Sequence, residues 1–101
     1  MKGRNPTVKE KKHMDKVQQL GCIVCHLSGM EGVPAEIHHI EGKTKQNAHL
    51  KVLPLCYEHH RMGVKTDLFV SRHPFKKEFE KRYGSEKLLL FKVMQLLVDD
   101  V

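Results

Sequence analysis

Two pairs of metal-binding residue types constrain this chain more than any other feature of its sequence. Cys22 and Cys25 are separated by two residues, and Cys56 and His59 repeat that spacing further along the chain. Zn²⁺ binds thiolate and imidazole, and a structural zinc site is filled by four protein ligands. The simplest pairing therefore places these four side chains around one tetrahedral zinc ion. In a chain of 101 residues, such an ion would add stability that a small core cannot supply alone.

Other uses of the first cysteine pair fit the chain less well. The run Cys22-Ile23-Val24-Cys25-His26 matches the attachment pattern of c-type haem, and a Cys-x-x-Cys pair also occurs in thioredoxin-like redox proteins. Haem attachment requires export and a distal ligand, whereas a thioredoxin-like site requires a surrounding βαβ pattern. The chain has three cysteines, an odd number, and opens with no apolar run of signal-peptide or membrane-spanning length. We therefore expect reduced thiols, a cytoplasmic location and no membrane association.

The two histidines that follow Cys56 are expected to serve different sites. If Cys56 opens a helix, Cys56 and His59 share one face of it, because residues three apart are neighbours on a helix surface. His60 lies about 100° further round the helix, so one ion is not expected to bind both histidines. His60 is then left for a second site, together with the adjacent pair His38 and His39.

The remaining pattern predicts an α+β fold. Thr7 and Glu10 fit a capping box, and Gly21 suits the end of the helix that they begin. Short strands are predicted over 35–40 and 51–55, and the second strand leads into the helix that starts at Cys56. We expect a single domain over 1–101, made of a basic N-terminal helix (1–21), a zinc knuckle with a ββα core (22–65) and C-terminal helices (66–101).

Two C-terminal helices are predicted. The first runs from His73-Pro74 through Tyr83, with proline in its first turn, and the second covers 85–100. The second is apolar on too many sides for a lone surface helix, so we expect it to be deeply packed or to contact a partner chain, for example in a homodimer. His73 is expected either to reach the second site or to cap the helix that follows it.

The chain is basic. It has 18 Lys and Arg residues against 12 Asp and Glu, a formal net charge of +6 and a pI near 9.3. Such a surplus favours a polyanionic partner such as nucleic acid. Arg61, Lys65 and Arg72 follow the predicted metal region and are candidates for DNA-phosphate contacts, which give affinity without reading sequence.

The order of these motifs resembles a known family. A Cys-x2-Cys pair, then a histidine pair on a strand, then Leu53-Pro54-Leu55-Cys56-x2-His59-His60 is similar to the HNH endonucleases with the ββα-metal motif. Within that family the chain looks most like the Ref-type phage recombination-enhancement nucleases, which act on DNA in RecA-directed strand-exchange complexes. The resemblance covers nearly the whole chain and includes Met1-Lys2-Gly3-Arg4, His13-Met14, Ala35-Glu36-Ile37-His38-His39 and Tyr83-Gly84.

The resemblance implies a role for each histidine of the motif. His38 and His60 would bind the catalytic divalent metal, and His39 would be the general base. His59 would replace the usual fourth cysteine of the zinc knuckle. The resemblance also implies that the substrate is DNA, that a RecA-type recombinase filament is a partner, and that the protein acts in a bacterial or phage-infected cell.

In one position the chain departs from the family pattern. Many HNH enzymes have an asparagine about five residues before the helix cysteine, where this chain has Lys51. Asn47 and His49 are the candidates to orient the base or to add a ligand, and His49 is preferred.

Phosphodiester hydrolysis needs a base to deprotonate water and a cation to stabilise charge on the phosphoryl and leaving oxygens. An imidazole with its ordinary pKa of about 6.5 can accept a proton at neutral pH. A two-histidine site would hold Mg²⁺ or Mn²⁺ with water and phosphate oxygens as the other ligands. Adjacent strand residues point to opposite faces, so His38 and His39 can act on one phosphate only if the strand end is twisted or the phosphate lies between them. Their roles could also be exchanged.

The sequence thus predicts a metal-dependent DNA endonuclease with a structural zinc ion. The alternative is a non-catalytic zinc-knuckle module that binds DNA or a protein. In that alternative, His38, His39 and His60 would have no shared use.

Overall fold

The computed structural model describes residues 5–42 and 45–99. In this part of the chain, helices surround one two-stranded antiparallel sheet, so the fold is α+β as predicted. The elements in order are α1 (Val8–Gln19), α2 (Ile23–Leu27), β1 (Glu36–His39), the 3₁₀ turn η1 (Ala48–Leu50), β2 (Val52–Leu55), α3 (Tyr57–His60), α4 (Lys76–Tyr83) and α5 (Glu86–Asp99).

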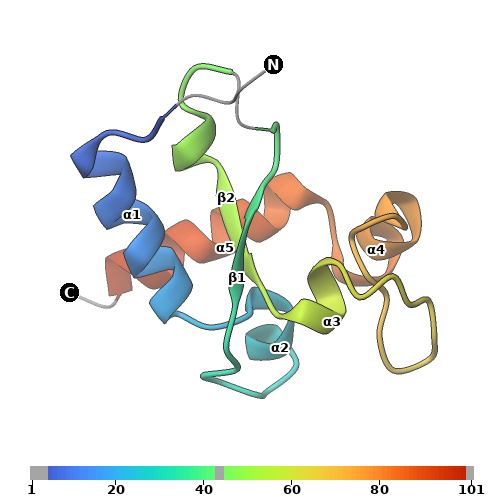
Figure 1. Cartoon of the computed structure of the whole chain (residues 1–101). Coiled ribbons are helices and arrows are strands. Elements are labelled where there is room, and N and C mark those ends of the chain that lie inside the picture. Colours follow the sequence, from blue (N-terminus) through green and yellow to red (C-terminus); the bar gives the residue numbers. More distant parts are fainter. Residues whose placement is uncertain (1–4, 43–44, 100–101) are drawn as a thin grey trace.

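The β1–β2 hairpin lies at the centre of the molecule. Its register pairs His38 with Leu53 and His39 with Val52. All four residues of β2 are buried, because α1, α2 and α5 all pack against this strand. Figure 1 shows α5 passing behind the hairpin, with α1 on one side and α4 set apart on the other. The hairpin leads directly into α3, so the predicted strand–strand–helix order is present.

The N-terminal helix begins as its sequence predicts. The side chain of Thr7 accepts a hydrogen bond from the Glu10 N–H at 3.1 Å, and the Glu10 carboxylate accepts one from the Thr7 N–H at 2.8 Å. This reciprocal capping box satisfies two backbone donors that would otherwise be unpaired. After the helix, Gly21 has a φ of +80°, and a Cβ there would lie 2.9 Å from the Val33 carbonyl oxygen. Only glycine fits this turn into the first cysteine pair without strain.

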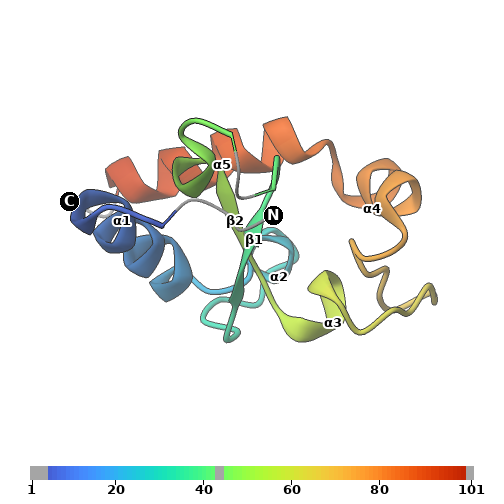
Figure 2. The same ribbon diagram turned by 45° about the horizontal axis from the view of Figure 1, so that its top comes forward.

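One buried cluster unites the helices and the sheet. Figure 2 shows α5 lying along one side of the hairpin, where it contacts β2 and α2. The core of fully buried side chains includes Val17, Ile23, Leu53, Leu55, Phe79, Leu89 and Val93.

The helix predicted from His73-Pro74 begins later than expected. It starts at Lys76, with Phe75 as its N-terminal flanking residue, so Pro74 is not in its first turn and His73 does not cap it. The physical reason is that the preceding backbone is already bonded elsewhere: the Arg72 N–H donates to the His59 carbonyl at 2.8 Å, and the His73 N–H donates to the His60 carbonyl at 2.9 Å. The short helix α2, which holds Cys25, was not predicted at all.

The last helix is packed on one face and exposed on the other. Leu89 and Val93 are fully buried, whereas Phe91 and Val98 are 58% and 71% exposed. The proposed homodimer through this helix stays a prediction. Among the described residues, none of the helices has the length and apolar character needed to cross a membrane.

Candidate metal centres and active site

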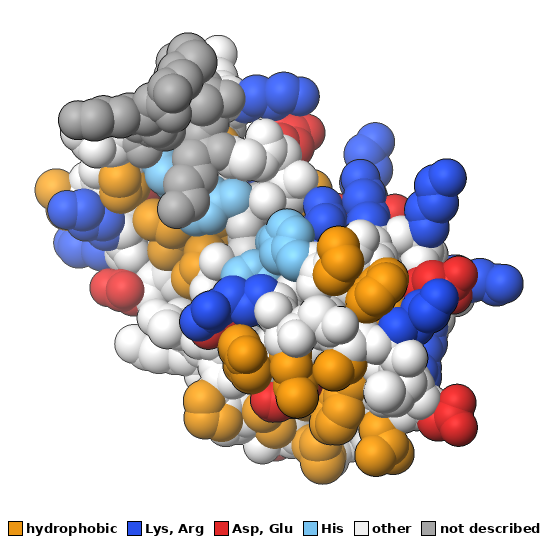
Figure 3. Space-filling model, turned by 45° about the vertical axis from the view of Figure 1, so that its right-hand side comes forward, with side chains coloured by type: hydrophobic (Ala, Val, Ile, Leu, Met, Phe, Trp, Pro, Cys, Tyr) orange, Lys and Arg blue, Asp and Glu red, His pale blue; other side chains and the backbone are white. Residues whose placement is uncertain are grey.

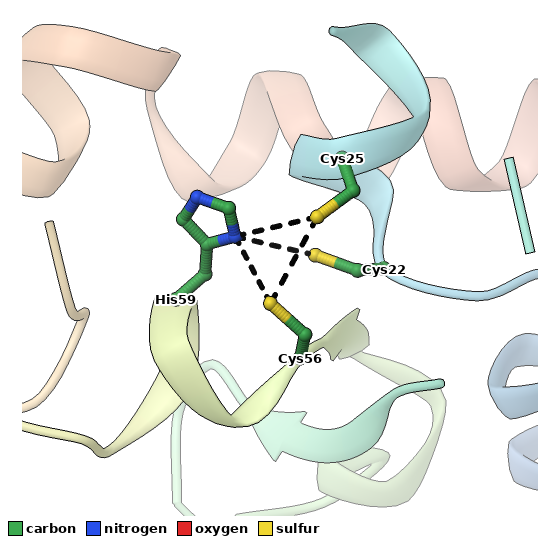
Figure 4. Close-up of side chains that lie close together, drawn as sticks. All are labelled: Cys22, Cys25, Cys56 and His59. Atoms are coloured by element: carbon green, nitrogen blue, oxygen red, sulfur yellow. Dashed lines mark hydrogen bonds between the residues drawn. The ribbon is translucent and has the colours of Figure 1, made fainter. Parts of the chain in front are cut away.

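Three cysteines and one histidine converge in the buried interior. Cys22 flanks the start of α2 and Cys25 lies within it, while Cys56 flanks the start of α3 and His59 lies within that helix. Figure 4 shows the three sulfur atoms and the Nδ1 atom of His59 pointing toward a common centre. All four residues are buried, and their potential ligand atoms lie within 4.8 Å of one another.

The distances in this Cys3His cluster fit a tetrahedral zinc ion. Zinc bonds of about 2.3 Å to sulfur and about 2.0 Å to nitrogen would place two sulfurs about 3.8 Å apart and a sulfur about 3.5 Å from a nitrogen. In the structure, the Cys25 and Cys56 sulfurs are 3.9 Å apart. Nδ1 of His59 lies 3.7, 3.6 and 3.1 Å from the sulfurs of Cys22, Cys25 and Cys56. The cluster can therefore hold a metal such as zinc.

The electrostatics of the three thiols also suit a cation. Burial opposes ionisation of Cys22, but hydrogen bonds from His59 and from backbone N–H groups outweigh it and lower the pKa of Cys22 to about 7. Burial and the neighbouring Cys22 sulfur raise the pKa of Cys25, and burial raises that of Cys56. The protein alone thus favours one thiolate, and a dication is the natural counter-charge for the other two.

A second cluster contains three histidines. His38 comes from β1, His60 from α3, and His73 from the segment before α4. Their ring centroids form a nearly equilateral triangle, with separations of 5.1, 5.1 and 5.2 Å. Their potential ligand atoms lie within 4.8 Å of one another. His38 is buried and His73 is exposed, so the cluster opens to solvent on its His73 side.

Two of these histidines are hydrogen-bonded to carboxylates. His38 donates from Nε2 to Glu86 Oε2 at 2.6 Å, and His60 donates from Nδ1 to Glu36 Oε1 at 2.8 Å. In each ring the other nitrogen is left to face a ligand. This carboxylate–histidine arrangement is common around protein-bound metals, where it fixes the ring and increases its basicity.

The charge states around the second cluster suit metal binding as well. Burial lowers the pKa of His60 and of His73, which favours the neutral imidazole that a metal requires. Two hydrogen bonds from Arg61 and one from His60 lower the pKa of Glu36 to about 2. Burial opposes ionisation of Glu86, but the His38 hydrogen bond and the Arg72 charge outweigh it and lower the pKa of this carboxyl.

The segment 71–73 ties the two clusters together. Besides the backbone bonds of Arg72 and His73, the fully buried Ser71 hydroxyl donates to the Glu58 carbonyl at 2.6 Å. It also accepts hydrogen bonds from the N–H groups of Gly63 and Val64 at 3.0 and 3.1 Å. The turn of α3 presents His59 to one cluster and His60 to the other. It is therefore held in place by the hydrogen bonds that segment 71–73 donates to it.

The remaining predicted histidines form a separate pair. Nε2 of His39 and Nδ1 of His49 are hydrogen-bonded at 3.0 Å. His49 is in the 3₁₀ turn η1 and is buried, while Asn47 adopts the left-handed backbone conformation that opens this turn. Of the two candidates to contact the predicted base, His49 is the one that the structure brings to it.

The three predicted DNA-contact residues have different environments. Arg61 is 60% exposed but forms a two-point salt bridge with Glu36. Lys65 is exposed and lies over the Phe75 ring. Arg72 is only 14% exposed, and its Nε lies 3.2 Å from Glu86 Oε1, so a phosphate contact would compete with an internal ion pair. Figure 3 shows histidines surfacing near the middle of one face, with Lys and Arg side chains beside them.

Sequence reasoning missed three members of this region or left them open. His73 was expected either to cap a helix or to reach the second site, and it joins the histidine cluster. Glu36 and Glu86 were not singled out. Glu36 could have been found, because residues two apart on a strand share a face and Glu36 precedes His38 by two positions. Glu86 carried no such signal.

Together, these features define a small α+β protein with a buried Cys3His cluster that can hold a metal ion, beside a second histidine cluster. The chain belongs to the family described as "Recombination enhancement, RecA-dependent nuclease", whose family model matches residues 6–98. This description names a nuclease that acts in recombination and depends on RecA.

Proposed function

We propose that this protein is a metal-dependent DNA endonuclease of the HNH type that acts in RecA-dependent recombination. The observation that carries the proposal is the separation of the Cys3His cluster from the His38, His60 and His73 cluster. Two adjacent residues of one helix, His59 and His60, belong to different clusters. A binding module needs only the first cluster for stability, whereas the second is suited to chemistry at its solvent-accessible side.

In this proposal, His38, His60 and His73 hold the catalytic divalent metal. When bound, Mg²⁺ or Mn²⁺ would polarise the scissile phosphate and stabilise charge on the leaving oxygen. Three imidazoles favour Mn²⁺ over Mg²⁺, because Mg²⁺ prefers oxygen ligands. A zinc ion held by Cys22, Cys25, Cys56 and His59 would have a structural role and would fix the start of α3.

His39 is the proposed general base. Its ring is on the strand that also carries His38, and its hydrogen bond to His49 would hold the imidazole in one orientation. The His39 ring would accept a proton from the attacking water, and His49 would keep that ring aligned as it becomes charged. Because adjacent residues of a strand point to opposite faces, the two rings would act on one phosphate only if it lies between them, with His38 toward the metal and His39 toward the nucleophile.

DNA would be held by its backbone. The net charge of +6 and the exposed Arg61 and Lys65 favour phosphate contacts that do not read sequence. A RecA-type filament would then supply the choice of DNA target, in agreement with the family description.

The test is a plasmid-nicking assay with Mg²⁺ or Mn²⁺, with and without a RecA filament on the DNA. His39→Ala is expected to lose at least about 100-fold in rate while still binding Mn²⁺, because only the proton acceptor is removed. His60→Ala is expected to lose Mn²⁺ binding as well as cutting. His26→Ala, which removes a histidine outside both clusters, is the matched control and should cut like wild type.

Two results would contradict the proposal. Cutting by His39→Ala at the wild-type rate would show that this residue is not the base. An absence of cutting by wild type, even with the filament present, would favour the alternative of a non-catalytic zinc-knuckle module.

A further inference from the structure

A buried carboxylate outside the ββα segment contacts the proposed metal site. Glu86 is 3% exposed and is the first residue of α5. Its Oε2 accepts the His38 hydrogen bond at 2.6 Å, and its Oε1 lies 3.2 Å from Nε of Arg72. A buried carboxylate is costly unless such partners compensate it.

The position of Glu86 is set by the core rather than by a flexible loop. Leu89 and Val93, further along α5, are fully buried, and the backbone N–H of Glu86 donates to Glu80 Oε2 at 2.9 Å. The carboxylate is therefore presented to His38 from a fixed helix end.

The contact of Arg72 with Glu86 is separate from the His38 hydrogen bond, because it is made at the other carboxylate oxygen, Oε1. This Arg72–Glu86 contact is an ion pair and not a hydrogen bond. Within the described ranges, neither Arg72 Nε nor Glu86 Oε1 makes a hydrogen bond. Arg72 thus balances the carboxylate charge, and the short hydrogen bond of Glu86 is the one to His38. A ring that donates from Nε2 has its lone pair on Nδ1.

We propose that Glu86 is a positioning residue for the catalytic metal. It fixes His38 as the Nε2–H tautomer and leaves Nδ1 for the ion. It also couples the packing of α5 against the rest of the protein to metal binding. The inference rests on the proposed function, because it assigns Glu86 to the metal site that the function requires. Removing such an outer carboxylate typically weakens metal binding by about 10- to 100-fold.

The experiment measures Mn²⁺ affinity by electron paramagnetic resonance, on zinc-loaded wild type, Glu86→Gln and Glu78→Gln. Glu78 is an exposed glutamate of α4, so its variant removes the same charge away from the site. For Glu86→Gln we expect a Kd for Mn²⁺ about 10- to 100-fold higher, and an equal shift in the Mn²⁺ concentration that gives half-maximal nicking. Saturating Mn²⁺ should restore most of the rate, and Glu78→Gln should match wild type.

A folded, zinc-loaded Glu86→Gln that binds Mn²⁺ within about twofold of wild type would overturn the inference. If this variant does not fold, the ¹⁵N chemical shifts of the His38 ring in wild type decide the question. They are measured at a pH above the ordinary histidine pKa, where a free imidazole is neutral. A proton on Nε2 supports the inference, and a proton on Nδ1 overturns it. Wild type that binds no Mn²⁺ at the histidine cluster would overturn the proposed metal site and this inference together. Wild type that binds and cuts, with Glu86→Gln equal to it, would overturn only the role of Glu86.

Discussion

The backbone N–H of His73 donates a hydrogen bond to the carbonyl oxygen of His60 at 2.9 Å. One residue earlier, Arg72 makes the same bond to His59 at 2.8 Å. A metal ion held by the Cys3His cluster would fix His59 and the turn of α3, and these two bonds would pass that position on to His73. The geometry of the histidine cluster is thus expected to depend on metal binding at the Cys3His cluster.

Removal of the structural metal is therefore expected to disrupt both sites. Cys56→Ser, or treatment of wild type with a strong chelator, should abolish the cooperative thermal transition, because apparent metal-binding free energies of about 10–16 kcal/mol in small zinc domains are part of their folding free energy. Zinc content and circular dichroism melts measure the effect. A melt unchanged by full zinc removal would contradict the structural role.

His73→Ala is expected to weaken Mn²⁺ binding by about tenfold or more without unfolding the protein, since His73 is exposed and the imidazole is one of three in the cluster. Isothermal titration with Mn²⁺ on zinc-loaded protein measures this change, and His26→Ala serves as the control. Equal affinity in His73→Ala and wild type would leave His38 and His60 as the protein ligands and remove His73 from the site.

Ser71→Ala is expected to lower the free energy of unfolding by about 1–3 kcal/mol, because it removes a fully buried hydroxyl that bonds the Glu58 carbonyl and two N–H groups. Urea unfolding of zinc-saturated protein measures it. Ser28→Ala is the matched control: its hydroxyl also donates to a carbonyl, that of Val24 at 2.9 Å, but Ser28 is exposed. Similar losses in both variants would show that the burial of Ser71 does not matter.

The stability of the protein is expected to depend on pH through His13. Burial lowers the pKa of His13 below its ordinary value of 6.5, against a hydrogen bond to the backbone of Leu50 that raises it. The unfolded chain therefore binds the proton more readily, so stability is complete above about 6.5 and falls as pH drops toward the folded-state pKa.

The measurement for His13 compares melting temperatures of wild type and His13→Gln across that pH window. The difference between the two should change with pH in the window and be constant above it. A constant difference throughout, or an NMR titration of His13 at or above the ordinary value, would contradict the expectation.

Much of the fold was predictable because its signals are local. The capping box at Thr7 and Glu10 and the two short strands follow from residues a few positions apart. The same holds for the assignment of His59 and His60 to different clusters, because adjacent helical residues diverge by about 100°. The late start of α4 was not predictable from Pro74, since the preceding backbone is bonded to α3, a contact that local sequence does not encode.

The sequence by itself determined the ligand set of the Cys3His cluster and the histidine pair of β1, because helix and strand periodicity fix which side chains share a face. The same strand periodicity places Glu36 on the face of His38, but does not determine its hydrogen bonds with His60 and Arg61. Only the tertiary structure decided that His73 joins His38 and His60, that Arg72 turns inward, and that Glu86 bonds to His38 from 48 positions away. Those contacts depend on how α5 and the segment before α4 pack against the hairpin, and packing between distant segments leaves no spacing in the sequence from which it can be read.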